Sequence, residues 1–185
     1  MTQAGKIRGN AILTTIPIFA CMIAVTPTIR PIQPEDDAEI AAVIRTVMTA
    51  HGADGEGFSI HDAEVDTMYE SYATDTTAYF VVERAGRVVG GAGIAPLEGG
   101  DAAVCELKKM YFLPTVRGMG MGRAILDHCL AAARVRGFRQ CYIETLATMT
   151  AAERLYRRAG FVPIERPLGA TGHSGCDRYY LLDLV

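Results

Sequence analysis

The sequence predicts one α/β domain over residues 28–185, preceded by an N-terminal segment of different character. Strand-like and helix-like hydrophobic patterns alternate along residues 28–185, which is typical of an α/β fold. No repeat, low-complexity tract or linker divides this part of the chain. A turn with Gly118, Gly120 and Gly122 joins an apolar strand to an amphipathic helix, and the domain is organised around it. The length of 185 residues also suits a single domain.

Residues 1–27 form an N-terminal extension whose status the sequence leaves open. Two basic residues precede an apolar run over residues 11–25, which is too short to span a bilayer. The run resembles the apolar region of a signal peptide, and residues 18–21 loosely resemble a lipoprotein cleavage site at Cys21. The alternative is an extension upstream of the true start, with Met22 as the initiator. We expect the second, and therefore a cytoplasmic protein.

The first half of the domain predicts these elements in order. A strand over residues 28–32 is followed by a helix that opens at Pro34 with acidic residues in its first turn. A second helix is expected over residues 61–72. Three strands follow, over residues 78–84, 87–94 and 102–113, the first two joined as a hairpin at Ala85-Gly86.

The second half alternates helices and strands. A helix runs from the glycine turn to about residue 136, where Gly137 ends it. The strand over residues 138–146 alternates, so that Glu144 shares a face with Gln140 and Tyr142. A short helix over residues 149–158, a strand from residue 161, a glycine-rich loop over 167–176 and a last strand over 177–185 complete the chain.

Composition excludes several classes of protein. The net charge of −3 supplies no basic field to attract nucleic acid. The five cysteines form no C-x-x-C pair, and we expect Cys105, Cys129 and Cys141 to be small buried apolar residues. The four histidines lack metal-ligand spacing with one another or with the cysteines, so no metal site is expected.

The glycine turn has the properties of a phosphate cradle. Its three glycines leave backbone N–H groups uncovered at a helix N-terminus, and Arg117 and Arg123 add positive charge at the rim. A P-loop needs Gly-Lys-Ser/Thr, whereas Gly122 is followed by Arg123-Ala124. A dinucleotide fingerprint fails on spacing, because its third glycine would fall at Arg123. A glycine-rich turn without a ligand is the remaining alternative.

Two segments carry a family resemblance. Arg117-x-x-Gly120-x-Gly122 resembles the R/Q-x-x-G-x-G/A signature of the GNAT N-acetyltransferase superfamily, and residues 152–161 resemble its A-x-x-L-Y-x-x-x-G-F segment. The resemblance extends from about residue 28 to residue 185. It implies a single mixed, mostly antiparallel twisted sheet of about seven strands with about four helices on both faces. Met149 departs from the family, in which many members carry Asn there, so one polar contact to the cofactor is in doubt.

The resemblance implies acetyl-CoA as the cofactor, with its pyrophosphate in the glycine loop and its pantetheine arm along the preceding strand. A backbone N–H near Met110 or Tyr111 would polarise the thioester carbonyl. The residues expected to bind the cofactor are Met110, Tyr111, Phe112, Arg117, Gly118, Met119, Gly120, Met121, Gly122 and Arg123.

Three residues are candidates for catalysis. The resemblance assigns to Tyr156 the proton donated to the departing thiolate; an ordinary half-buried tyrosine is the alternative. Glu144 and Glu106 are candidate bases, because an alkylammonium group must lose a proton at neutral pH. Each could equally be a solvated carboxylate or a partner of a nearby Lys or Arg. Alternation does not decide the direction of Glu106, because bulges are frequent in the family's corresponding strand.

The polar loop after residue 167 is expected to form a wall of the acceptor pocket, with His173 and Asp177 facing the substrate; a surface loop is the alternative. We therefore expect an acetyl-CoA-dependent N-acetyltransferase that acts directly on a primary amine of a small molecule, amino acid or peptide. A non-catalytic acyl-CoA sensor or interaction module is the alternative. No nucleic-acid or membrane partner is expected, and the protein would be a monomer or homodimer.

Overall fold

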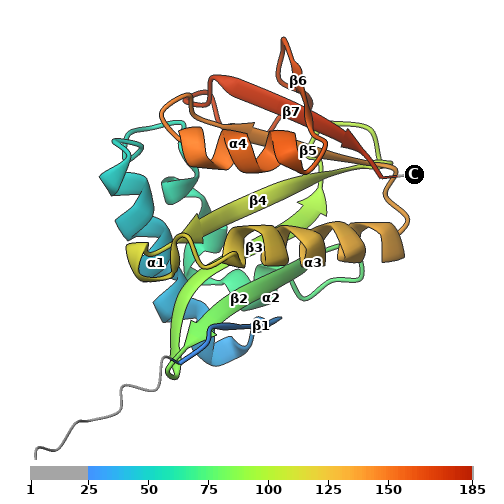
Figure 1. Cartoon of the computed structure of the whole chain (residues 1–185). Helices are drawn as coiled ribbons and strands as arrows, with labels where there is room; N and C mark the ends of the chain where they lie inside the picture. Colours follow the sequence, from blue (N-terminus) through green and yellow to red (C-terminus); the bar gives the residue numbers. More distant parts are fainter. Residues whose placement is uncertain (1–24, 185) are drawn as a thin grey trace, which may run out of the picture.

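The computed structural model describes residues 25–184, so residues 1–24 of the N-terminal extension, including Cys21 and Met22, lie outside the described range. The described residues form one mixed seven-stranded sheet with helices on both faces (Figure 1). No helix among them is both long and apolar enough to cross a membrane.

The strands confirm the mixed, mostly antiparallel sheet. They lie in the order β1-β2-β3-β4-β5-β7-β6, and every neighbouring pair is antiparallel except β4 and β5. Their bounds are β1 Thr28–Pro31, β2 Ala78–Arg84, β3 Arg87–Pro96, β4 Val104–Phe112, β5 Gln140–Thr145, β6 Val162–Ile164 and β7 Arg178–Asp183.

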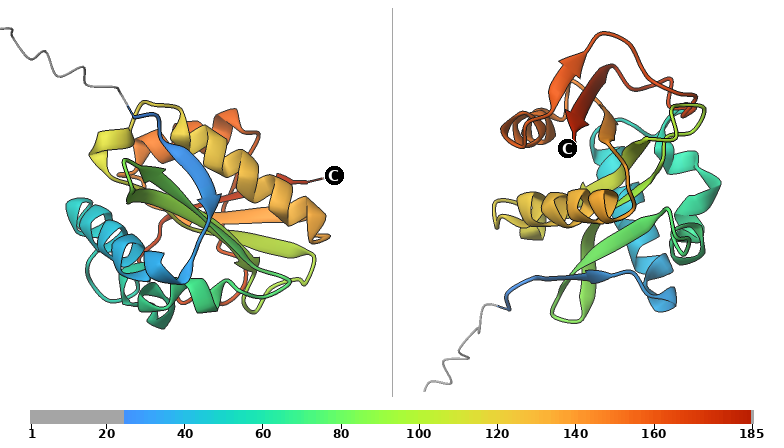
Figure 2. Two further views of the ribbon diagram at one scale, coloured as in Figure 1. Left: turned by 90° about the horizontal axis from the view of Figure 1, so that it is seen from below. Right: turned by 90° about the vertical axis from the view of Figure 1, so that its right-hand side faces the viewer.

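The helices cover both faces of the sheet, as Figure 2 shows: α1 and α2 on one face, α3 and α4 on the other. Their bounds are α1 Asp37–Ala50, α2 Met68–Ser71, α3 Met121–Val135 and α4 Thr150–Arg158, with short 3-10 turns η1 Pro34–Asp36, η2 Ser59–His61, η3 Ala63–Asp66 and η4 Pro114–Val116. The two larger clusters of buried apolar residues lie on opposite faces of the sheet, and apolar stripes on α1 and α3 supply many of their residues. Cys105, Cys129 and Cys141 are fully buried free thiols, as predicted.

The continuous helix predicted over residues 61–72 is wrong. This segment consists of η2, η3 and the four-residue α2. Asp62 has extended backbone angles (φ −62°, ψ 134°), and Thr67 leaves helical geometry at φ −135°, ψ 44°. The break at Asp62 allows its carboxylate to reach Lys109 and His173 inside the protein.

The parallel strands β4 and β5 separate soon after they begin to pair. They are paired only over residues 104–106 of β4 and 140–142 of β5. Beyond these residues the two strands diverge, and Figure 1 shows the opening between them. Backbone N–H and C=O groups on the facing edge of β4 are therefore left without a strand partner, as a ligand that adds to a sheet edge requires.

A β-bulge in β4 reorders the side chains beside this opening. The register passes from Gly91–Tyr111 directly to Gly93–Lys108, so that two residues of β4 oppose one residue of β3. Lys109 lies in the bulge with φ 50°, in the left-handed region that a non-glycine residue seldom adopts. The bulge shifts the alternation by one residue, so the neighbours Lys108 and Lys109 both reach the same wall of the opening.

Candidate active site

A pocket lies at the divergence of β4 and β5. It gathers side chains from both strands, from α1, η2 and α4, and from the loop before β7. The structure thus brings together six of the predicted site residues: Glu106, Met110, Tyr111, Glu144, Tyr156 and His173. The other contributors are Met48, Phe58, Ser59, Leu107, Lys108, Lys109, Thr145, Leu146, Met149, Ala152 and Cys176.

Glu106 is a buried carboxyl on β4, 4% exposed. Burial raises its pKa to about 7, although the positive charge of Lys108 opposes the shift. A carboxyl group with a pKa near 7 can both accept and release a proton at neutral pH. The alternative that Glu106 is a solvated outer-face residue does not fit its position.

Glu144 on β5 has one anchored and one free carboxylate oxygen. Its Oε1 accepts hydrogen bonds from the hydroxyls of Tyr142 at 2.7 Å and Thr171 at 3.0 Å. Its Oε2 is buried and has no hydrogen-bond partner among the described residues. Buried polar atoms are normally paired. The free oxygen is therefore a place for a ligand with a donor or a positive charge.

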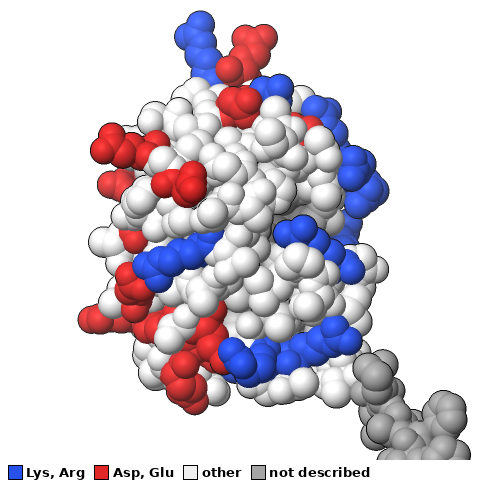
Figure 3. Space-filling model, turned by 90° about the vertical axis from the view of Figure 1, so that its left-hand side faces the viewer, with Lys and Arg blue, Asp and Glu red and all other residues white. Residues whose placement is uncertain are grey.

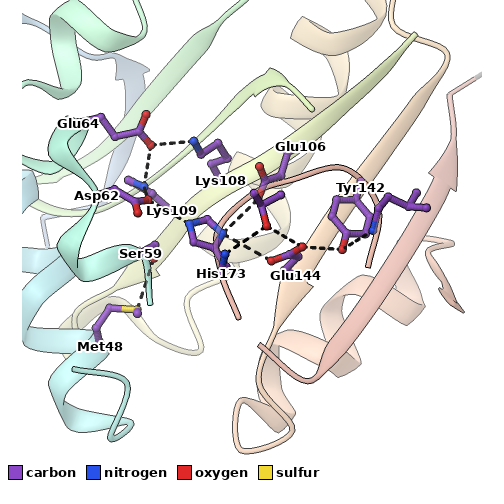
Figure 4. Close-up of polar contacts among 12 residues, drawn as sticks. Met48, Ser59, Asp62, Glu64, Glu106, Lys108, Lys109, Tyr142, Glu144 and His173 are labelled. Atoms are coloured by element: carbon purple, nitrogen blue, oxygen red, sulfur yellow. Dashed lines mark hydrogen bonds and ion pairs between the residues drawn. The ribbon is translucent and has the colours of Figure 1, made fainter. Parts of the chain in front are cut away.

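His173 bridges the two walls of the pocket (Figure 4). Its Nε2 lies 3.1 Å from Asp62 Oδ2, and its Nδ1 lies 3.6 Å from Glu144 Oε2 and 3.8 Å from Glu106 Oε1. The carboxylates of Asp62 and Glu144 raise the pKa of His173 to about 9, against the opposing effect of burial. The structure thus places His173 at the pocket, which is where the sequence led us to expect it.

Sequence reasoning missed the acidic residues of the opposite wall and their lysine partner. Lys109 Nζ lies 2.5 Å from Asp62 Oδ2 and 2.7 Å from Glu64 Oε1, and its side chain is 1% exposed. Lys108 Nζ also reaches Glu64 Oε1 at 3.0 Å. Although burial opposes the shift, the His173 hydrogen bond and the Lys109 charge lower the pKa of Asp62 to about 2. No spacing in the sequence relates Asp62 and Glu64 to Lys109 and His173, so no sequence signal indicated this wall.

Tyr156 enters the pocket from α4. It is 5% exposed, and its ring lies against the rings of Phe161 and Tyr180, with centroids 5.9 and 6.2 Å away. Its hydroxyl lies 3.9 Å from Met110 Sδ on β4, close to the divergence of the strands. Burial raises the pKa of this phenol, so that it keeps its proton at neutral pH.

The glycine loop has the geometry of an anion cradle. Gly118 and Gly120 have φ of 75° and 80°, and a Cβ at either would meet nothing within 4 Å. Gly120 caps α3, and the N–H groups of Gly120, Met121 and Gly122 make no hydrogen bond within the described residues. Open space, uncovered donors and a helix N-terminus together fit the pyrophosphate of a CoA ligand.

The remaining predicted cofactor residues lie around this cradle. Arg117 and Met119 are exposed, and Arg117 Nε donates to the Phe112 carbonyl at 3.3 Å. Arg123 is also exposed, but its Nε lies 2.9 Å from both carboxylate oxygens of Asp127. Arg123 is thus partly neutralised, whereas the charge of Arg117 faces solvent at the rim.

Asp177 is the predicted substrate-binding residue that the structure does not bring to the pocket. Its Oδ1 accepts the N–H of Ala147 at 2.8 Å, and its side chain is 55% exposed. The contact links the start of β7 to the turn after β5. A neighbouring residue of the same loop, Cys176, lines the pocket instead.

A sheet that opens beside a glycine loop with uncovered N–H groups, with carboxylates and a phenol in the opening, is an arrangement that suits a CoA-dependent acyltransferase. Residues 36–161 match the model of the Acetyltransferase (GNAT) family, and the chain belongs to this family. It is therefore an N-acetyltransferase, and family membership implies acetyl-CoA as its cosubstrate.

Known proteins agree with this assignment. The chain is 41% identical over 160 residues to an uncharacterized N-acetyltransferase, YjgM, of Escherichia coli K12, covering 86% of this chain and 96% of that protein. A GNAT-family acetyltransferase structure from Staphylococcus aureus Mu50 superposes with a TM-score of 0.76 at 18% identity, covering 86% of this chain and all of that one. The acetyltransferase yncA of Salmonella typhimurium, determined with acetyl-CoA, gives a TM-score of 0.67 at 22% identity over 86% of this chain and 95% of that one.

Proposed function

We propose that this acetyltransferase transfers the acetyl group of acetyl-CoA directly to a primary amine of a small molecule, an amino acid or a peptide. One observation carries the proposal: Glu106, Glu144 and Tyr156 line a single pocket where β4 and β5 part. A proton acceptor and a proton donor thus stand beside the strand edge at which a thioester would lie.

Glu144 and Glu106 have different roles toward the amine. The free Oε2 of Glu144 receives a hydrogen bond from the incoming ammonium group, because its other oxygen is already held by Tyr142 and Thr171. Glu106 is the base that takes one proton from the ammonium group, which frees the lone pair of the nitrogen for attack on the acetyl carbon. Both residues are buried, so water does not compete effectively for these contacts.

Tyr156 completes the proton balance. Acetyl-CoA supplies the activated acyl group as a thioester. The C–N bond forms as the C–S bond breaks, and the Tyr156 hydroxyl donates a proton to the departing sulfur. The second proton that the nitrogen loses as the amide forms returns to the Tyr156 oxygen. A backbone N–H of β4 at Met110 or Tyr111, beside the bulge, stabilises the negative charge on the carbonyl oxygen. No covalent intermediate on the protein is needed, since Cys176 has no identified base and burial raises its pKa to about 12.

The charge distribution supports this arrangement of ligands. On the face shown in Figure 3, acidic side chains gather along one margin and basic side chains along the opposite margin. A groove beside the pocket is lined by three acidic residues, Asp62, Glu64 and Glu98, and by Lys108 and His173, which pair with the first two. The polyanionic cosubstrate would lie on the basic side and a cationic acceptor would enter from the acidic side. An intracellular cosubstrate also supports the expected cytoplasmic location.

Incubation with acetyl-CoA and a panel of amines tests the proposal. The panel contains amino acids, diamines and peptides with free N-termini, each paired with its N-acetylated form. We expect thiol release that depends on one class of free amine, with the acetylated product identified by mass spectrometry. Release that is equal for the free and blocked forms would contradict amine transfer. CoA binding without release for any amine would favour the sensor alternative.

A further inference from the structure

We propose that Glu106, Glu144 and His173 form a binding site for a divalent transition-metal ion, for which Zn²⁺ is the probe. One ligand atom of each residue lies within 4.8 Å of the others. Zinc bonds to nitrogen and oxygen are about 2.0–2.2 Å long, so tetrahedral ligand atoms lie about 3.3 Å apart. His173 Nδ1 is already 3.6 Å from Glu144 Oε2 and 3.8 Å from Glu106 Oε1. Shifts of a few tenths of an ångström would bring His173 Nδ1 to ligand spacing from both carboxylates, and the two carboxylate oxygens, within 4.8 Å of each other, would approach by side-chain rotation.

The free oxygen of Glu144 is a second observation that points to a cation ligand at this place. The Glu144 side chain is 3% exposed, and its Oε2 has no hydrogen-bond partner among the described residues. The imidazole of His173 balances the charge of this oxygen from 3.6 Å without a hydrogen bond, so an ion that bonds to the oxygen directly would satisfy it better. Figure 4 shows that the carboxylate points to the space that it shares with Glu106 and His173.

Two of the three ligand residues, His173 and Glu144, are held by hydrogen-bond partners in the way that metal ligands usually are. His173 Nε2 faces Asp62 Oδ2 at 3.1 Å, and Lys109 holds Asp62 in turn. A carboxylate behind the imidazole directs the other ring nitrogen toward the metal. Glu144 is held in the same way through Oε1 by Tyr142 and Thr171. The orientations of His173 and Glu144 are therefore set before a metal binds.

The charges and the open coordination position indicate what the metal would do. Two carboxylates and a neutral imidazole balance one dication, so binding releases the proton from His173 Nδ1. Three protein ligands leave a fourth position that faces the pocket. This consequence rests on the proposed function: the ion would occupy the place where Glu106 and Glu144 meet the acceptor amine. Zinc would then inhibit acetyl transfer in competition with the amine.

Zinc titration of the chelator-stripped full chain against a chromogenic competitor tests the site without using activity. We expect one ion per chain, and more than about tenfold weaker binding for His173→Ala and for Glu144→Gln. His128→Ala is a matched control, because His128 is exposed on α3. Cys176→Ser tests the one thiol that lines the pocket. Both controls should bind zinc as the unmodified chain does.

Two outcomes would overturn the site. They are equal affinity in all variants, and loss in Cys176→Ser with retention in Glu144→Gln. Thermal unfolding without metal verifies that each variant is folded. Zinc binding without acetyl transfer to any amine would support the metal site and count against the proposed function, whereas transfer without zinc binding would do the reverse.

Discussion

Glu144 Oε2 lies 3.6 Å from His173 Nδ1 and has no hydrogen-bond partner among the described residues. Its counterpart Oε1 accepts two hydroxyl hydrogen bonds. One oxygen thus fixes the carboxylate on β5, and the other is left for whatever enters the pocket. This asymmetry distinguishes Glu144 from a carboxylate that only stabilises the fold.

Replacement of this carboxylate should weaken acceptor binding. Glu144→Gln keeps the shape but removes the charge that meets an ammonium group, and a hydrogen bond to a charged group contributes about 1.5–3 kcal/mol. We expect the KM for the amine to rise about tenfold or more while CoA affinity is unchanged. Steady-state kinetics of the variant, with the exposed Glu70→Gln as control, measures the effect. An unaltered KM would remove Glu144 from the acceptor site.

Glu106→Gln should chiefly lower turnover. The amide has nearly the same size but cannot take a proton from the amine, and a positioned base contributes about 10²–10⁴-fold to the rate. We expect a loss of kcat in that range with the product still formed slowly. Stopped assays at saturating acceptor and acetyl-CoA measure it. A kcat within a factor of two of the original would assign the base to another group.

Tyr156→Phe separates chemistry from cofactor binding. The variant keeps the ring contacts with Phe161 and Tyr180 and removes only the hydroxyl beside Met110 Sδ. Turnover should fall by about 10²-fold or more, because the departing thiolate loses its proton donor. CoA affinity, measured by calorimetry, should stay the same. Tyr69→Phe, at a 39% exposed position, is the control. Full activity of Tyr156→Phe would exclude this tyrosine as the acid.

Gly120→Val should weaken CoA binding through the cradle. A valine at φ 80° strains the backbone, and its side chain would cover the N–H groups at the start of α3. Gly86→Val is a matched control, since Gly86 has φ 73° and its Cβ would also meet nothing within 4 Å. Both variants should lose similar stability, and only Gly120→Val should lose affinity for CoA. Equal affinities would place the phosphate site elsewhere.

Asp36 should make the stability of the fold depend on pH. Its carboxylate is 5% exposed and pairs with Arg30 at 2.6 Å. Although burial opposes it, the Arg30 hydrogen bond and the Gln33 N–H lower the pKa of Asp36, and Glu83 shares the same guanidinium. The stability that Asp36 contributes is fully present above the pKa of about 4 that its carboxyl group has in the unfolded chain. It is lost as the pH falls from there through the lower pKa of the folded state.

Asp36→Asn tests this dependence by urea unfolding. We expect the variant to be less stable by about 2 kcal/mol at pH 7, since Arg30 loses its buried partner, and the difference to shrink toward pH 3. Asp66→Asn, which breaks an exposed pair with Arg45, should change stability little at either pH. A difference that stays constant between pH 7 and pH 3 would contradict the assignment.

The sequence by itself determined the order of the strands and of the longer helices, and the position of the glycine turn before α3. These features are local: alternation, helical spacing and the glycines at positions 118, 120 and 122 act over a few residues. The pattern of residues 152–161 likewise placed Tyr156 on a short helix that ends at a glycine. For the same reason the buried cysteines were predicted from their apolar neighbours.

Only the tertiary structure decided how the acidic groups of the site meet. The bulge at Lys109 depends on the pairing of β4 with β3, and it turns Lys109 toward Asp62. Asp62, Glu144 and His173 come from three segments that are far apart in the chain, so no spacing in the sequence relates them. Strand pairing and the break between η2 and η3 bring them within a few ångströms, because such contacts depend on the packing of the whole fold.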